Sequence, residues 1–431
     1  MGAPSATIFA LATPPGRGGV AVIRISGPDA FAAGEQLAGG LPPVRTVGLR
    51  RIRARGGAVL DEALVLPFEA AASFTGERVV ELHTHGSLAV VDAILAELAG
   101  LGGLTAAEPG EFTRRAFENG RLDLVQVEGL AELIEAETEE QLRRAQDVYS
   151  GSLSRTFLEI REGLVEALAL SEARIDFADE ELPDDLSQRL LESVGAVASR
   201  VRDLIAGASA ARRVQSGFEI AIVGPPNVGK STLLNAIAER EAALVSDIAG
   251  TTRDVIEVRL SLGGLLVTFL DTAGLRETDD VIESAGVSRA RARARQADLR
   301  LFLCNPGGLP DQDLIQTGDI LRWTKADLHP SDNAVSAVTG EGMSELLSAI
   351  TFRLRHIASS SGLMASRRQE DRAVACLQML EAAISALGVD APAEFVSEEL
   401  RGATRELDAV LGKVDVEAVL GQIFSSFCIG K

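Results

Sequence analysis

The stretch Phe218-Glu-Ile-Ala-Ile-Val-Gly-Pro-Pro-Asn-Val-Gly-Lys-Ser231 decides the fold of the central part of the chain. The apolar run that ends at Val223 predicts a buried strand, and the apolar spacing from Thr232 onward predicts a helix. Between them, Gly224 and Gly229 allow backbone angles and close approaches that a Cβ would forbid. A strand, a glycine-containing loop and a helix in this order predict a loop whose N–H groups bind a di- or triphosphate.

The polar residues of this loop have expected tasks. The Lys230 ammonium would lie beside the β- and γ-phosphates, and the Ser231 hydroxyl would bind Mg²⁺. A structural glycine turn without a ligand is the alternative, but it does not explain the order of strand, loop and helix. The expected phosphate contacts are Gly224, Asn227, Val228, Gly229, Lys230, Ser231 and Thr232.

The composition is that of a soluble globular protein of two or three domains, with 431 residues, 46% hydrophobic and 24% charged. No apolar run approaches the roughly 20 residues of a membrane helix. Cys304, Cys376 and Cys428 show no paired spacing, so we expect a reducing, cytoplasmic location. The net charge of −20 argues against a protein that binds nucleic acid unaided, but it leaves a local basic patch or a basic partner open.

Four segments differ in their periodicity. Residues 1–120 combine short strands with one or two helices, which predicts a small α+β domain. The clearest strands are expected at Val20–Ile25, Ala63–Leu66 and Val79–Leu82, and the clearest helices at Leu88–Leu98 and Arg114–Phe117. Residues 121–213 are helical, with an apolar stripe at Leu153, Phe157, Ile160, Leu164 and Leu168.

Residues 214–355 alternate strand and helix signals, as in an α/β domain that binds a nucleotide. Residues 356–431 are helical again. We therefore expect an inserted, Ras-like α/β domain that splits one all-helical domain into residues 121–213 and 356–431.

Further motifs follow the loop in the order found in GTPases. Gly250-Thr251-Thr252-Arg253-Asp254 has the first switch position, where Thr252 would reach Mg²⁺. A hairpin is expected from Val255 to Leu270 around Gly263-Gly264. It leads into Asp271-Thr-Ala-Gly274, where Asp271 would hold the Mg²⁺ shell and the Gly274 N–H would contact the γ-phosphate.

Thr324-Lys325-Ala326-Asp327 has the position of a base-reading motif. The Asp327 carboxylate can accept hydrogen bonds from guanine N1–H and N2–H, which adenine does not supply. Thr324 stands where Asn is commonest, so we expect an altered guanine affinity. Ser336-Ala337-Val338-Thr339-Gly340 fits the loop behind the base, and the joint order of the motifs favours guanine over adenine.

The residue after Gly274 is Leu275, where Ras-type enzymes have a glutamine that orients the attacking water. Hydrolysis therefore needs another group, and the nearby candidates are Arg253, Arg276, Glu277 and Glu283. Each could instead be a solvated loop charge, the reading we favour for Arg276 and Glu277.

Taken together, Thr13-Pro-Pro-Gly-Arg-Gly-Gly-Val20, Gly250-Thr-Thr-Arg-Asp254, Asp271-Thr-Ala-Gly-Leu-Arg276 and Phe424-Ser-Ser-Phe-Cys-Ile-Gly-Lys431 resemble the MnmE (TrmE) family of tRNA-modification GTPases. The resemblance covers both ends and the centre of the chain. It implies an N-terminal domain that dimerises and binds a folate, a split helical domain and an inserted G domain.

For the nucleotide site, the resemblance implies that Asn227 coordinates a K⁺ ion. The loop from Ser246 through Ile248 to Thr251 would close over that ion, which would supply the charge that an arginine finger gives elsewhere. Glu283 would orient the hydrolytic water through a second water.

For a reduced folate, 5-formyl- or methylene-tetrahydrofolate, the resemblance implies a site at Arg24, Glu81, Arg121 and Lys431. Arg24 lies in an apolar strand and needs a partner, so a local ion pair with Glu81 is the alternative. Arg121 departs from the expected Lys, which changes the geometry of that contact. The stretch 305–323 is shorter than the family pattern.

His83 and His85 are expected on one face of a strand, but no further metal ligands are spaced nearby, so we do not expect a metal site there. Cys428, close to Lys431, is either a reactive thiolate or a plain buried cysteine.

The resemblance implies a K⁺-activated GTPase that, with a flavin-containing MnmG-type partner in a heterotetramer, modifies C5 of the tRNA wobble uridine. The alternative is a nucleotide switch for ribosome or complex assembly, since Leu275 allows slow hydrolysis.

Overall fold

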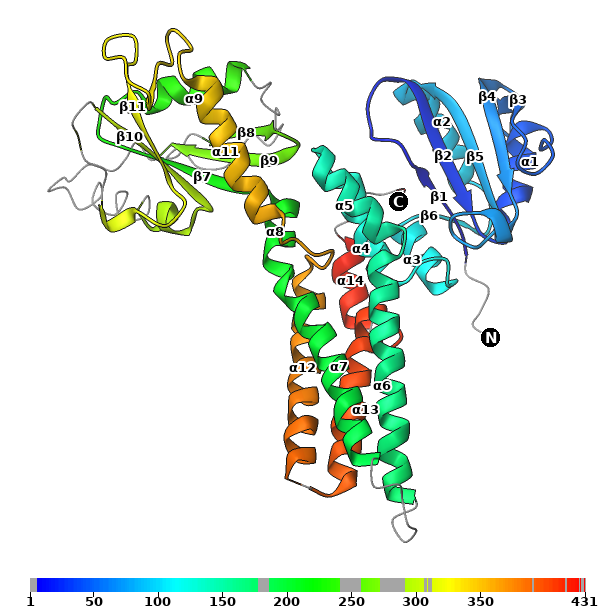
Figure 1. The fold of residues 1–431 in the computed structure, drawn as a ribbon. Coiled ribbons are helices and arrows are strands. Elements are labelled where there is room, and N and C mark those ends of the chain that lie inside the picture. Colours follow the sequence, from blue (N-terminus) through cyan, green and yellow to red (C-terminus); the bar gives the residue numbers. More distant parts are fainter. Residues whose placement is uncertain are drawn as a thin grey trace, which may run out of the picture. The chain divides into compact units, whose positions relative to one another are not determined.

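The computed structural model describes residues 6–176, 186–240, 257–271, 291–305, 308, 312–389, 391–414, 417–425, 427 and 430. They belong to two compact units, one made of Met1–Ala131 with Asp408–Lys431 and the other of Glu132–Leu407. Each unit has its own six-stranded sheet (Figure 1). None of the helices in the described part of the chain is long and apolar enough to cross a membrane.

The sheet of the first unit has the strand order β3-β4-β5-β2-β1-β6. Neighbouring strands are antiparallel, except that β1 and β6 are parallel. The three predicted strands lie inside β2, β4 and β5 and are confirmed. The strands are β1 (Thr7–Leu11), β2 (Gly18–Ser26), β3 (Gly48–Arg53), β4 (Val59–Phe68), β5 (Val79–Gly86) and β6 (Leu104–Ala106).

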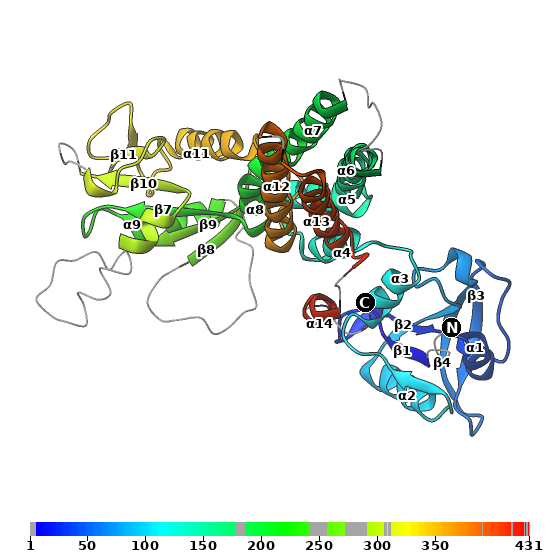
Figure 2. The same ribbon diagram turned by 90° about the horizontal axis from the view of Figure 1, so that it is seen from below.

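Helices α1 (Ala30–Ala38) and α2 (Leu88–Ala99) lie beside this sheet (Figure 2). Their apolar residues join those of the strands in one buried cluster. The short helix η1 (Ala70–Ala72) and α3 (Glu111–Glu118) follow in the loops, and α4 (Leu124–Glu135) comes next. Far along the chain, α14 (Glu417–Ser425) returns to this unit, where Phe424 and Phe427 join Val127 in a separate apolar cluster.

The sheet of the second unit has the order β12-β11-β10-β7-β9-β8, parallel throughout except for β8. Its central strands β7, β9 and β10 are mostly apolar and almost entirely buried, as expected for strands covered on both faces. Its elements are β7 (Phe218–Val223), α9 (Lys230–Arg240), β8 (Glu257–Leu262), β9 (Leu265–Asp271), β10 (Leu299–Cys304), η2 (Gln312–Leu314), β11 (Ile320–Thr324), β12 (Ala334–Val335) and α11 (Met343–Ala358).

The predicted hairpin is confirmed: β8 and β9 are antiparallel, and Leu262 pairs with Leu265. Gly263 and Gly264 have φ of 60° and 83°. Two successive positive φ values are what a tight two-residue hairpin turn needs, and glycine adopts them without strain.

The remaining helices come from both sides of the α/β segment. They are α5 (Glu139–Tyr149), α6 (Ser152–Asp176), α7 (Leu186–Ala206), α8 (Ala208–Ser216), α12 (Arg367–Gly388) and α13 (Ala393–Leu411). Helix α7 packs along α12, and the Ser171 and Ser397 hydroxyls of α6 and α13 are hydrogen-bonded at 2.8 Å. The expected fold class, an α+β domain, a split helical domain and an inserted Ras-like domain, is confirmed. The exact domain boundaries stay predictions.

Candidate functional site

The phosphate loop lies between β7 and α9, as the sequence predicts. A Cβ at Gly224 would lie 2.4 Å from the Leu303 carbonyl oxygen of β10, so only glycine fits at this crossing. Gly229, with φ of 101°, and Asn227, with φ of 58°, hold the left-handed turns that lead into the helix. The loop thus leads directly into the N-terminus of α9, where free backbone N–H groups favour anions.

Lys230 begins α9 and is 7% exposed. Its Nζ donates hydrogen bonds to the carbonyl oxygens of Gly224 (2.9 Å) and Pro225 (3.1 Å). Burial lowers the pKa of the ammonium, and the Asp271 carboxylate opposes that shift. A phosphate at this loop would offset the cost of burying the cation.

The Mg²⁺ site can be tested on Ser231 and Asp271. The Ser231 hydroxyl donates to Asp271 Oδ2 at 2.6 Å. Asp271 is 2% exposed, and its Oδ1 has no hydrogen-bond partner among the described residues. A buried, unpaired carboxylate oxygen beside a hydroxyl is costly unless a cation completes it. These oxygens are the ligands that Mg²⁺ prefers, so the donor set fits the ion.

A cavity of about 320 Å³ adjoins the phosphate loop. The Ser336 hydroxyl donates to Asp327 Oδ1 at 2.7 Å and accepts from the N–H groups of Val338 (3.3 Å) and Thr339 (3.2 Å). The Asp327 carboxylate is therefore held in one orientation. The cavity is lined by Asn227, Val228, Gly229, Thr232, Leu233, Thr324, Lys325, Asp327, Leu328, Val335, Ser336, Ala337 and Val338.

Among the lining residues, Leu233, Leu328 and Val335 were not named from the sequence, and Val338 was named only within the loop behind the base. Leu328 and Val338 are 65% and 81% exposed, although both are apolar. Exposed apolar side chains in the loops around a polar motif are the signal that could have identified them. A flat base would cover them.

Thr324 is buried, and its hydroxyl donates to the Cys304 carbonyl oxygen at 3.4 Å. That contact holds the base-reading loop to the end of β10. Lys325 follows with φ of 62°, in the left-handed region. The loop therefore turns sharply between Thr324 and the exposed Asp327.

Several expected nucleotide and ion contacts lie outside the described residues. They are Ser246, Ile248, Gly250, Thr251, Thr252, Gly274, Leu275 and the four candidate groups for hydrolysis, Arg253, Arg276, Glu277 and Glu283. Their roles stay predictions.

The first unit holds the expected folate residues. Arg24 of β2 and Glu81 of β5 are register partners, and the Arg24 Nε and Nη2 atoms lie 3.0 Å from Glu81 Oε1. The guanidinium also lies 5.8 Å and 5.6 Å from the ring centroids of Phe74 and Phe112. The local ion pair considered from the sequence is present, and the two aromatic rings were not anticipated.

The other expected folate contacts are Arg121 and Lys431. Arg121 is exposed, next to Gly76, and its N–H donates to the Ala116 carbonyl oxygen at 2.8 Å. Lys431 and Cys428 lie outside the described residues. Gly430 is described: a Cβ there would lie 2.1 Å from the Leu11 carbonyl oxygen, so the end of the chain packs against β1.

The two histidines have carboxylate neighbours. His83 Nε2 lies 3.2 Å from Glu81 Oε2, and His85 Nδ1 lies 2.7 Å from Asp61 Oδ1. Among the described residues, no group of three or more potential His, Cys, Asp or Glu ligands is close enough to hold a metal ion.

Comparison with known proteins identifies the family. Residues 7–121 match the model of the GTP-binding protein TrmE N-terminus, and residues 124–428 match that of the MnmE helical domain. The chain is 52% identical to the tRNA modification GTPase MnmE of Dinoroseobacter shibae over 427 residues, which are 99% of this chain and 100% of the relative. It is 51% identical to the MnmE of Cereibacter sphaeroides ATCC 17029 over 429 residues, with the same coverage.

Among solved structures, a variant of Aquifex aeolicus Era bound to GDP·AlF₄⁻ matches 38% of this chain and 66% of its own, with 24% identity and a TM-score of 0.27. This likeness is too weak to support an inference about function. The two family models and the full-length relatives agree with the order of the motifs and with the geometry of the phosphate loop. The chain therefore belongs to the MnmE (TrmE) family of tRNA-modification GTPases, and it is a GTP hydrolase.

Proposed function

We propose that this GTPase is activated by K⁺ and that, with a flavin-containing partner of the MnmG type, it modifies C5 of the wobble uridine of tRNA. The observation that carries the proposal is the joint presence, in one chain, of a built nucleotide site and of an N-terminal unit against which the C-terminal motif packs. The similarity to tRNA modification GTPases over 99% of the chain supports the same reading.

The modification is tested in a strain that lacks this gene. Mass analysis of wobble uridine in its tRNA should show loss of the C5 group, and the intact chain should restore it. A Lys230→Ala variant should not restore it, because the phosphate site would be lost. Unchanged wobble uridine in the deletion strain would contradict the proposal.

K⁺ activation rests on Asn227, which lines the nucleotide cavity with a left-handed backbone. In the proposed site, Asn227, Ser246, Ile248 and Thr251 coordinate the ion, and its charge stabilises the transition state. Glu283 orients the attacking water, the task that Leu275 cannot perform. Equal GTP turnover in K⁺ and Na⁺ would refute the cation mechanism.

A reduced folate is proposed at Arg24, Glu81, Arg121 and Lys431. The aromatic rings beside Arg24 and the packing of Gly430 on β1 support this site, because they surround the cation with flat apolar surface and bring the chain end to the same sheet. Calorimetry with 5-formyltetrahydrofolate tests it. Deletion of Lys431 should weaken binding while GTP hydrolysis persists, and undiminished binding would remove that residue from the site.

A homodimer is proposed through the first unit. Leu49 and Leu64 are register partners on β3 and β4, and both are exposed, by 61% and 44%. A second copy would cover this apolar pair. Leu64→Glu should then give monomers in sedimentation velocity, and a persistent dimer would exclude this face. The acidic chain suits a cytoplasmic complex in which the partner supplies the charge that binds tRNA.

A further inference from the structure

The β8–β9 hairpin runs from the nucleotide site to helix α5. At one end, β9 finishes at Asp271, whose carboxylate accepts the Ser231 hydroxyl of the phosphate loop. At the other end is the turn Gly263-Gly264. In the sequence, the hairpin directly follows the first switch motif and directly precedes the rest of the motif ending at Gly274. Each of the two motifs is therefore connected to the turn by a single strand, so a movement of either motif can reach the turn.

The turn is fixed to two helices by hydrogen bonds. The Gly264 carbonyl oxygen accepts the N–H of Glu140, in the first turn of α5, at 3.2 Å. The N–H groups of a first helical turn have no partner within the helix, so this bond satisfies one of the free N–H groups of α5. The Gly263 carbonyl oxygen accepts Arg355 Nη2 of α11 at 3.1 Å. A Cβ at Gly263 would lie 2.6 Å from Thr351 Cγ2, so the fit against α11 is close.

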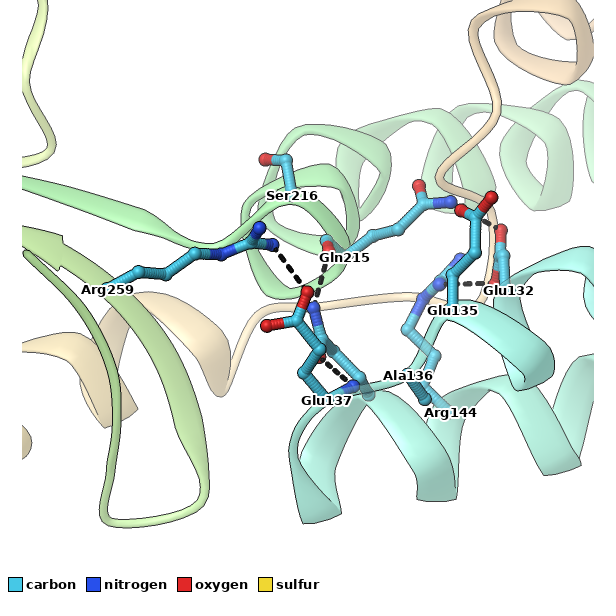
Figure 3. A pocket seen from close by; sticks show the side chains of 9 residues that line it. Glu132, Glu135, Ala136, Glu137, Arg144, Gln215, Ser216 and Arg259 are labelled. Carbon is cyan, nitrogen blue, oxygen red and sulfur yellow. Dashed lines mark hydrogen bonds and ion pairs between the residues drawn. The ribbon is translucent and has the colours of Figure 1, made fainter. Parts of the chain in front are cut away.

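An ion pair on the side of the hairpin reaches the same helix. Arg259 Nη2 of β8 lies 3.0 Å from Glu137 Oε1, just before α5 (Figure 3). The Glu137 N–H donates to Gln141 Oε1 at 3.0 Å, and Gln141 Nε2 donates to the Gln215 carbonyl oxygen at 2.7 Å. The start of α5 is thus linked both to β8 and to the end of α8.

This contact is polar and lies beside open space. The side chains of Arg259 and Glu137 are 37% and 36% exposed. A cavity of about 550 Å³ adjoins it and is lined by Arg259, Glu137 and Arg144. A second cavity, of about 510 Å³, adjoins the hairpin turn and is lined by Gly264, Arg143 and Arg355. An exposed ion pair can open and close without uncovering an apolar core. By contrast, the neighbouring side chains of Arg144 and Glu132 are nearly buried and form an ion pair of 2.7 Å, which suits a contact that stays closed.

We propose that the β8–β9 hairpin transmits the nucleotide state to helix α5, and that the Arg259–Glu137 ion pair is its latch. The hairpin holds α5 through Gly264 and Arg259 in one nucleotide state and releases it in the other. This device rests on the GTPase activity of the chain and not on the folate, the K⁺ ion or the flavoprotein partner.

Hydrogen–deuterium exchange of the peptide covering residues 137–149 tests the proposal directly, because the Glu140 amide is protected by the hairpin turn. In the full-length chain with Mg²⁺, exchange there should differ between GDP and a non-hydrolysable GTP analogue. Arg259→Ala should abolish that difference, while GDP affinity and basal GTP hydrolysis stay within about twofold.

Two further variants separate a latch from a merely structural contact. Arg259→Glu combined with Glu137→Arg reverses the charges and should restore the nucleotide-dependent difference. Arg200→Ala removes another exposed ion pair, 2.8 Å long, between Arg200 and Glu159. That pair is far from the hairpin in sequence, so this variant should behave as the parent chain. Equal exchange in both nucleotide states of the parent chain, or a full response in Arg259→Ala, would overturn the proposal.

Discussion

Removal of the Ser336 hydroxyl tests how this chain reads guanine. Ser336 is 1% exposed, and its hydroxyl donates to Asp327 Oδ1 while it accepts two backbone N–H groups. In Ser336→Ala the carboxylate keeps its charge but loses the bond that orients it. The two N–H groups of the loop lose their acceptor as well.

The size of the effect follows from the kind of bond. A hydrogen bond to a charged group contributes about 1.5–3 kcal/mol. Since about 1.4 kcal/mol corresponds to a tenfold change in an equilibrium constant, GDP affinity should fall about ten- to hundredfold. Fluorescence titration with a labelled GDP measures it. Thr339→Ala is the matched control and should stay within about twofold, because its exposed side chain accepts only a 3.4 Å bond from the Glu341 N–H.

A double-mutant cycle shows whether Ser336 acts through Asp327. If it does, Ser336→Ala should cost little more once Asp327→Ala has removed the carboxylate. A full, additive loss in the Asp327→Ala background would refute this reasoning, since the hydroxyl would then act on the loop alone.

Three other outcomes are expected. Gly224→Ala should destabilise the chain by about 1–3 kcal/mol and weaken nucleotide binding, because the new Cβ would overlap the Leu303 carbonyl. Its control is Gly195→Ala on helix α7, where the new Cβ meets open space. This control should stabilise the chain by about 0.5–1 kcal/mol in thermal unfolding. Asp327→Asn should shift preference from GTP to xanthosine triphosphate in competition assays, because one acceptor becomes a donor; unchanged preference would place base reading elsewhere. Burial lowers the pKa of Lys230 below its usual 10.5, and a bound phosphate should raise that pKa again. GDP affinity should therefore fall as the pH rises toward 10.5, and calorimetry should show that binding takes up a proton. GDP binding that does not depend on pH would contradict this.

The parts of the site that local signals specify could be predicted from the sequence. The strand, the loop from Gly224 to Ser231 and the following helix are determined within a few residues. The hairpin turn needs only two glycines with positive φ. A cation in an apolar strand, Arg24, requires a partner, and Glu81 is indeed paired with it.

Contacts between distant segments could not be predicted in this way. Phe74 and Phe112 reach Arg24 from a loop and from α3, and no local pattern specifies that meeting. Arg259 and Glu137 each look like an ordinary surface charge in the sequence. Only the register of β8 and the start of α5 bring them to 3.0 Å.

The return of the chain to its first unit bears on how the protein is made. Phe424 packs next to Gly110, and Gly430 packs against Leu11, so residues from both ends complete one body. A ribosome adds about 5–20 residues per second, so the 300 residues after Ala131 take about 15–60 s. During that time the apolar surface around Val127 that receives α14 has no covering helix. The first unit therefore begins to fold first and is completed last. A ribosome that stalls before residue 424 would leave a nascent chain with a formed GTPase fold and an exposed apolar patch.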